Sequence, residues 1–216
     1  MSKLLKKELE KIKNNLLALG AMIEDRLQTM GYAIENMDSK IARQIIEGDH
    51  EIDEAEVAIE EECLKLIALF QPVAIDLRFL VSVIKINNDM ERIGDLTANV
   101  AHRLLIASKE KERNFIFDYS EMATRVKHML KNSLDSFVNM DLELARTIKG
   151  MDDAVDKIKN HAYDMTKVFL KEHPDKAGYA INMFLISRHL ERIADMATNI
   201  AEEIIYIIEG SIIRHT

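Results

Sequence analysis

The chain repeats itself, and the repeat limits what it can fold into. The sequence Glu-Arg-Ile-Gly-Asp begins at Glu91, and one hundred residues later Glu-Arg-Ile-Ala-Asp begins at Glu191. The match extends upstream, where residues 36–53 align with residues 139–156 at a constant shift of 103. Such a long internal repeat predicts two copies of one structural unit.

Both copies of the central stretch have the spacing of a helix packed against other helices. Apolar and small residues recur at alternating intervals of four and three: Ile86, Met90, Ile93, Thr97, Val100 and Leu104, then Ile186, Leu190, Ile193, Ala197, Ile200 and Ile204. Helix-forming residues are plentiful, whereas seven glycines and two prolines provide few tight turns. The sequence therefore predicts an all-α protein.

Each half is expected to hold a long, a short, a medium and another long helix. In the first half these span about 3–35, 38–47, 50–70 and 72–111. Asp38 and Asp49 can serve as N-caps, and Pro72 suits a first helical turn. A three-helix bundle with its first helix interrupted accounts for that order. We therefore predict two tandem three-helix bundles packed side by side, over residues 1–112 and 113–216.

A second face of each repeated helix is acidic. Glu91 and Asp95 are four residues apart, as are Glu191 and Asp195, and another such pair begins each medium helix. Two acids at this spacing repel each other by about 0.2–0.5 kcal/mol. Their presence in both halves suggests that a cation lies over them. A solvated helix face, or neutralisation by Arg92 and Arg192, are the alternative explanations.

The two acidic pairs of each half are expected to meet. A short connection makes the medium and long helices antiparallel neighbours, and at about 1.5 Å per residue the pairs lie at nearly the same height. Clustered carboxylates suit hard cations such as Mg²⁺, Ca²⁺, Mn²⁺ or iron. The predicted metal ligands are Asp49, Asp53, Glu91 and Asp95 in the first half, and Asp152, Asp156, Glu191 and Asp195 in the second.

Charge and hydropathy exclude other classes of protein. The net charge of −8 leaves no basic footprint for nucleic acid. No stretch approaches 18 uncharged apolar residues, so we expect a cytoplasmic protein that meets the membrane only through partners. The single cysteine, Cys63, falls in an apolar helical series and is expected to be a buried hydrophobic residue.

Taken together, these motifs resemble the PhoU family of bacterial phosphate-signalling regulators. The resemblance covers essentially the whole chain and includes the four acidic pairs and the turn at residues 71–78. It implies multinuclear iron or zinc, and negative regulation together with a phosphate ABC transporter ATPase and a sensor histidine kinase. The second half has Arg188 and His189 where the first has Asn88 and Asp89, and Glu172-His-Pro-Asp replaces the Gln71-Pro-Val-Ala turn. These departures imply a second site less fully metallated than the first.

Three kinds of function fit the sequence. The leading hypothesis is a non-enzymatic, metal-binding adaptor of phosphate signalling, with a homodimer as the common default. A ferritin-like di-iron carboxylate enzyme is the alternative, but it needs Glu-x-x-His on two helices, and only Glu47 to His50 fits. A metal-free helical scaffold is the third. No catalytic residue is predicted, because the chain has no nucleophile elbow, phosphate loop or H-E-x-x-H motif.

Overall fold

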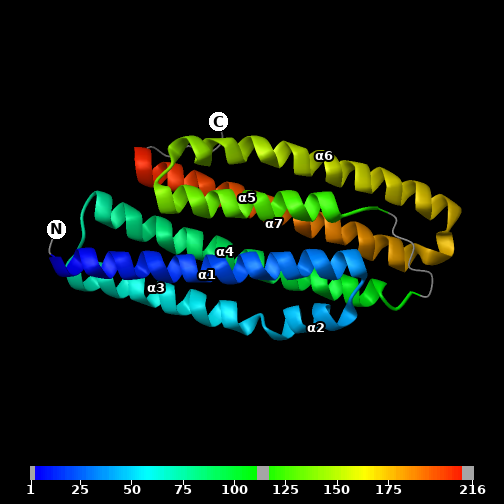
Figure 1. Cartoon of the computed structure of the whole chain (residues 1–216), viewed down its shortest axis with the longest axis horizontal. Helices are drawn as coiled ribbons and strands as arrows, with labels where there is room; N and C mark the ends of the chain where they lie inside the picture. The colour runs from blue at the N-terminus through cyan, green and yellow to red at the C-terminus, as the bar shows by residue number, and fades with distance from the viewer. Residues whose placement is uncertain (1–2, 111–116, 211–216) are drawn as a thin grey trace.

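The computed structural model describes residues 3–110 and 117–210, and the regular elements in these ranges are all helices (Figure 1). They are α1 (Lys3–Asn36), α2 (Ser39–Glu47), α3 (His50–Phe70), α4 (Ile75–Ala107), α5 (Ser120–Asn139), α6 (Leu142–Glu172), the short 3-10 helix η1 (Pro174–Lys176) and α7 (Ala177–Glu209). The all-α prediction is confirmed. The boundary predicted at 112/113 lies outside the described residues.

The helices run along the length of an elongated molecule, with α1–α4 on one side and α5–α7 on the other (Figure 1). Helices α4 and α7, which carry the two central stretches, pack against each other. They are antiparallel, because Lys85 and Arg103 of α4 contact Glu203 and Asn182 of α7, respectively. The predicted arrangement of two helical bundles side by side is confirmed.

The core is formed by the seam that the sequence predicted. All twelve seam residues of α4 and α7 are buried. The one polar member, Thr97, donates its hydroxyl to the carbonyl oxygen of Ile93 at 2.7 Å, so its burial leaves no unpaired hydroxyl proton. Cys63 is fully buried as expected, and burial raises the pKa of its thiol to about 12. The buried apolar side chains of both halves form one continuous cluster.

The second half departs from the predicted helix order. Where the first half has the separate helices α2 and α3, the second has the single helix α6. The predicted separation of a short and a medium helix in the second half is therefore wrong. Gly48 ends α2 in the first half, and at the shift of 103 the matching residue is Met151, which continues the helix.

An arginine on α1 stabilises the break between α2 and α3. Its guanidinium donates to the carbonyl oxygen of Gly48 at 2.6 Å and to Oδ1 of Asp49 at 2.9 Å. This residue, Arg26, is matched by the buried Met129 in the second half, which has no donor to offer. Asp49 is the N-cap residue of α3 as predicted, but its side chain accepts from Arg26 and makes no capping bond to the helix. Asp38 caps α2 as predicted.

Helices α3 and α4 approach closely at Gly94. A Cβ atom there would lie 3.0 Å from Cδ1 of Ile52. The matching pair in the second half is Ala194 and Val155, which are both buried. Alanine is larger than Gly94 and valine is smaller than Ile52, so the two changes offset each other in volume.

We expect Gly94→Ala to lower the free energy of unfolding by about 1 kcal/mol, because overpacking outweighs the gain in helix propensity. Adding Ile52→Val should restore most of that loss. Urea denaturation measures both changes. Gly150→Ala is the control, since its added methyl meets open space and should stabilise. Strictly additive effects of the two substitutions would contradict this account.

Candidate functional site

The first four predicted ligands come together between α3 and α4. We call Asp49, Asp53, Glu91 and Asp95 the first acidic cluster. The two helices are in register there, because the side-chain amide of Asn87 on α4 donates to the carbonyl oxygen of Glu56 on α3 at 2.9 Å. The sequence-based expectation that the two pairs lie at the same height is therefore met.

Like charges accumulate in the first acidic cluster. Burial raises the pKa of Glu91, and the negative charges of Asp95, Asp53, Glu56 and Asp49 raise it further. Burial also raises the pKa of Asp49, whereas the neighbouring Arg26 guanidinium lowers it. Glu56, which the sequence analysis did not select, thus belongs to the same electrostatic environment. The charges that act most strongly on Glu91 are all negative, so this part of the cluster favours a bound cation.

The four predicted ligands of the second half also meet, between α6 and α7. We call Asp152, Asp156, Glu191 and Asp195 the second acidic cluster. It contains a cation of its own: the ammonium group of Lys159 lies 2.8 Å from Oδ1 of Asp156 and 2.9 Å from Oε1 of Glu191. Sequence analysis missed this lysine.

Lysine does not remove all the repulsion in the second acidic cluster. Burial raises the pKa of Asp195 to about 6, and the carboxylates of Glu191, Asp152 and Asp156 add to the shift, while Lys159 opposes it. Burial is the largest cause of the raised pKa of Asp152, and the negative charge of Asp156 is the next largest. The second cluster is therefore crowded with acids but partly neutralised.

The donor sets differ in how well they fit a metal ion. Within residues 3–110 and 117–210, no group of three or more histidine, cysteine, aspartate or glutamate side chains is already arranged to hold one. The first acidic cluster has the oxygen donors that suit a hard cation, and Arg26 offsets part of its negative charge at Asp49. In the second, Lys159 lies between two of the would-be ligands. Metal binding stays a prediction for both clusters.

Arg92 and Arg192, the predicted neutralising residues, are exposed on α4 and α7. The cations that contact the clusters are Arg26, from α1, and Lys159, from α6. Both cations could have been noticed in the alignment of the two repeats, because each aligns with a residue of a different kind. Arg26 aligns with Met129, and Lys159 aligns with Glu56.

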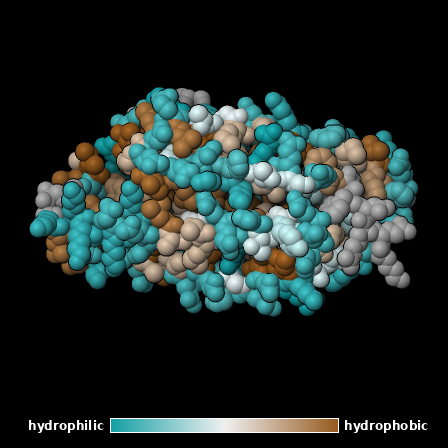
Figure 2. Space-filling view, viewed as in Figure 1, coloured by the Kyte–Doolittle hydropathy of each residue, from teal (hydrophilic) through white to brown (hydrophobic). Residues whose placement is uncertain are grey.

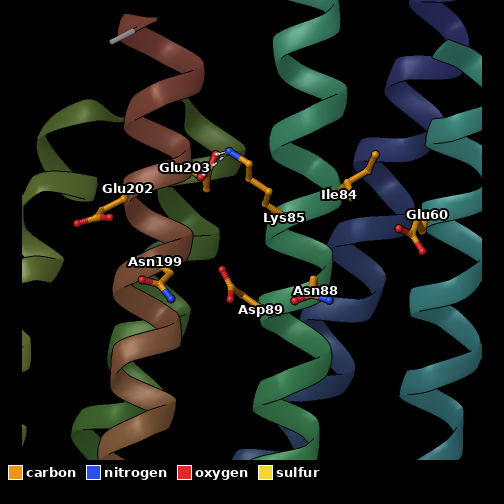
Figure 3. Close-up of a pocket in the computed structure, with 8 residues that line it drawn as sticks. All are labelled: Glu60, Ile84, Lys85, Asn88, Asp89, Asn199, Glu202 and Glu203. Carbon is orange, nitrogen blue, oxygen red and sulfur yellow. Dashed lines mark hydrogen bonds and ion pairs between the residues drawn. The ribbon is translucent and has the colours of Figure 1, made fainter. Parts of the chain in front are cut away.

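A groove of about 660 Å³ lies between α4 and α7, and none of the eight predicted ligands lines it (Figure 3). Its walls are polar and come from three helices: Glu60, Ile84, Lys85, Asn88, Asp89, Asn199, Glu202 and Glu203. Glu203 is buried, and its carboxylate accepts bonds from Lys85 at 3.0 Å and from the hydroxyl of Ser82 at 3.2 Å. The ion pair between buried Glu203 and partly exposed Lys85 links α7 to α4, which is a structural role.

The turn between α3 and α4 exposes hydrophobic side chains. Leu69, Val73, Ile75 and Leu77 are 66%, 75%, 70% and 37% exposed, and we call them the apolar tip. Hydrophobic side chains are visible at this end of an otherwise mainly hydrophilic face (Figure 2). Helix α4 begins at Ile75. Pro72 therefore lies in the connecting turn and not, as predicted, in the first turn of the helix.

The backbone of this turn is unusual. Gln71 has φ 46° and Ala74 has φ 50°, values that residues with a Cβ rarely adopt. No helix in the described part of the chain is long and apolar enough to cross a bilayer. Such strain persists where surrounding structure imposes it and is frequent at functional surfaces.

The chain matches a family model, described as the PhoU domain, twice, over residues 16–104 and 119–204. It is 35% identical over 210 residues to the phosphate-specific transport system accessory protein PhoU homolog of Pseudomonas aeruginosa, covering 96% of this chain and 86% of that protein. The Aquifex aeolicus homolog is 34% identical over 209 residues, covering 97% and 95%.

Solved structures give the same picture. The crystal structure of PhoU from Pseudomonas aeruginosa superposes with a TM-score of 0.90 at 34% identity, covering 95% of this chain and 99% of that one. The phosphate transport system regulatory protein PhoU from Streptococcus pneumoniae gives a TM-score of 0.85 at 28% identity, covering 98% and 100%.

Proposed function

Because this chain belongs to the PhoU family, we propose that it is an accessory protein of a phosphate-specific transport system that restrains phosphate-starvation signalling. It does so without catalysis, by binding the transporter ATPase and a sensor histidine kinase in the cytoplasm. The observation that carries this proposal is the likeness to PhoU homologs over nearly the whole chain, in sequence and in fold. Homodimer formation belongs to the same proposal.

The apolar tip supports a role in binding partners. Isolated exposed hydrophobic residues are ordinary, but four within nine residues of sequence, at a turn with two positive φ angles, suit a protein contact. We assign the tip to the transporter ATPase, which would bring the regulator to the membrane. Val73 and Ile75 are the most exposed members and lie away from both acidic clusters.

Metal has a structural part in the proposal. Asp49, Asp53, Glu91 and Asp95 would hold iron or zinc, with Mg²⁺, Ca²⁺ or Mn²⁺ as alternatives, and the cation would offset their mutual repulsion. Bound there, it would tie α3 to α4, the two helices that the apolar tip joins. The cation thereby supports the shape of the partner-binding surface.

Deleting the gene tests the proposed function. We expect the phosphate regulon of the host to be expressed in phosphate-rich medium, measured as transcript levels or with an alkaline phosphatase reporter. Wild-type protein should restore repression and recover the transporter ATPase or the kinase in pull-downs.

A paired complementation tests the surface. A Val73→Ser and Ile75→Ser variant should fold normally, since both side chains are exposed, yet fail to repress. Val57→Ser, an exposed residue on α3 outside the tip, is the matched control. A deletion strain with normal repression would refute the regulatory role, and would favour a scaffold with another task.

A further inference from the structure

We propose that Lys159 replaces a metal ion in the second acidic cluster, so that this chain has one metal-dependent cluster and one neutralised by its own lysine. The inference rests on the proposed function, because it takes the first acidic cluster to be the metal site. It adds that the two repeats have diverged into a metal-dependent and a metal-independent form of the same site.

The geometry of Lys159 is that of a bridging cation. Its ammonium nitrogen lies 2.8 Å from Asp156 on its own helix and 2.9 Å from Glu191 on the neighbouring helix. A positive charge thus connects α6 to α7 through one acid of each pair, as a shared metal ion would. The Lys159 and Glu191 side chains are only 23% and 20% exposed, so water screens this bridge incompletely.

The first acidic cluster has no lysine at the position equivalent to Lys159. The residue matched to Lys159 is Glu56, which adds a negative charge to that environment. Arg26 of α1 contacts this cluster, but its partner there is Asp49. Among the described residues, no positively charged side chain links Asp53 to Glu91 in the way that Lys159 links Asp156 to Glu191. An ammonium group therefore joins α6 to α7 in the second repeat. The equivalent helices of the first repeat, α3 and α4, would need a bound cation for the same link.

A metal ion and Lys159 compete for the same carboxylates. To bind a cation at the second acidic cluster, the protein must break both contacts of the lysine and bring a second positive charge close to it. The residue at position 159 therefore decides whether the second cluster takes metal. Substituting glutamate, the residue found at position 56, supplies a further oxygen ligand and removes the competitor.

Metal content measured on the full-length protein tests this inference. The metal-free protein, prepared with a chelator, is equilibrated separately with Fe²⁺, Zn²⁺ and Mn²⁺, desalted and analysed by inductively coupled plasma mass spectrometry. We expect Asp53→Asn with Asp95→Asn to remove the metal of the wild-type protein, and Asp152→Asn with Asp195→Asn to leave it unchanged. Lys159→Glu should raise the metal bound per chain about twofold, because the two clusters then offer similar oxygen donors.

The stability of the metal-free protein gives an independent readout. With chelator present, Lys159→Met should lower the Tm by about 4 °C, since it leaves crowded carboxylates without their counter-ion. Lys157→Met, an exposed lysine on the same helix, is the control and should have little effect. Lys159→Gln, which removes the charge but keeps a polar side chain, replaces the Met and Glu variants if these fold poorly.

Different outcomes distinguish the two proposals. Two results would overturn the role of Lys159. One is that the wild-type protein loses its metal only when Asp152 and Asp195 are changed as well, and the other is that the metal-free Lys159→Met protein has an unchanged Tm. A wild-type protein that binds none of the three metals, with Lys159→Met still destabilised and Lys159→Glu gaining metal, would instead overturn metal binding at the first acidic cluster and retain the lysine bridge.

Discussion

Replacing Asp53 and Asp95 together by asparagine should abolish metal-dependent stabilisation of the protein. A ligand at 100 times its Kd stabilises a folded protein by about 2.7 kcal/mol when it binds the folded state alone. For a chain of this length that corresponds to about 5–10 °C in Tm. The double variant should lose this gain in differential scanning calorimetry with and without added Zn²⁺ or Fe²⁺.

The sign of the effect without metal separates a binding defect from misfolding. Burial and neighbouring acids raise the pKa of Glu91, so removing two of those charges relieves repulsion. The metal-free double variant should therefore be at least as stable as the metal-free wild type. Glu54→Gln with Glu61→Gln removes the same charge from exposed positions of α3 and should retain the response to metal. A full response in the Asp53/Asp95 variant would show that metal binds elsewhere.

Asp195→Asn should stabilise the metal-free protein at neutral pH. Burial raises the pKa of Asp195 to about 6, from an ordinary value of 3.8. The folded protein therefore binds this proton more tightly than the unfolded chain does. Stability is then lost as pH rises from about 4 to about 6, and it stays lost at higher pH. Allowing for the partial exposure of the side chain, the loss is about 1–2 kcal/mol.

The pH profile provides the measurement. Urea denaturation of the metal-free protein between pH 4 and 8 should show a smaller fall in the free energy of unfolding for Asp195→Asn than for the wild type. At pH 7.5 the variant should melt about 3–6 °C higher. Asp25→Asn, at an exposed position of α1, removes the same charge and should preserve the wild-type profile. Parallel profiles for wild type and Asp195→Asn would contradict the raised pKa.

Features determined by local sequence were predictable. The seam of α4 and α7 follows the period of one helix, and each of its twelve residues is buried. The N-cap of α2 is Asp38, whose side chain accepts from backbone amides two and three residues ahead. Helix α1 ends at Asn36, one residue later than expected. In each case the interactions lie within one helix or at its end.

Features that depend on contacts between helices were missed. The break before α3 depends on Arg26, 22 residues earlier on another helix, so the same acidic motif was wrongly expected to start a separate helix in the second half. The repeat alignment marks Lys159 as different from Glu56, but the placement of its ammonium group between Asp156 and Glu191 depends on the register of α6 and α7, which the sequence alone does not fix. Periodicity predicts which face of a helix is buried but not which cation will lie against its acids.

The continuous core has a thermodynamic consequence. Helices α4 and α7 each contribute their seam to one apolar cluster, so separating the two repeats would expose side chains that both need to bury. The repeats should therefore unfold in a single cooperative transition, although each matches the family model separately. A ligand that binds only one repeat then raises the unfolding temperature of both.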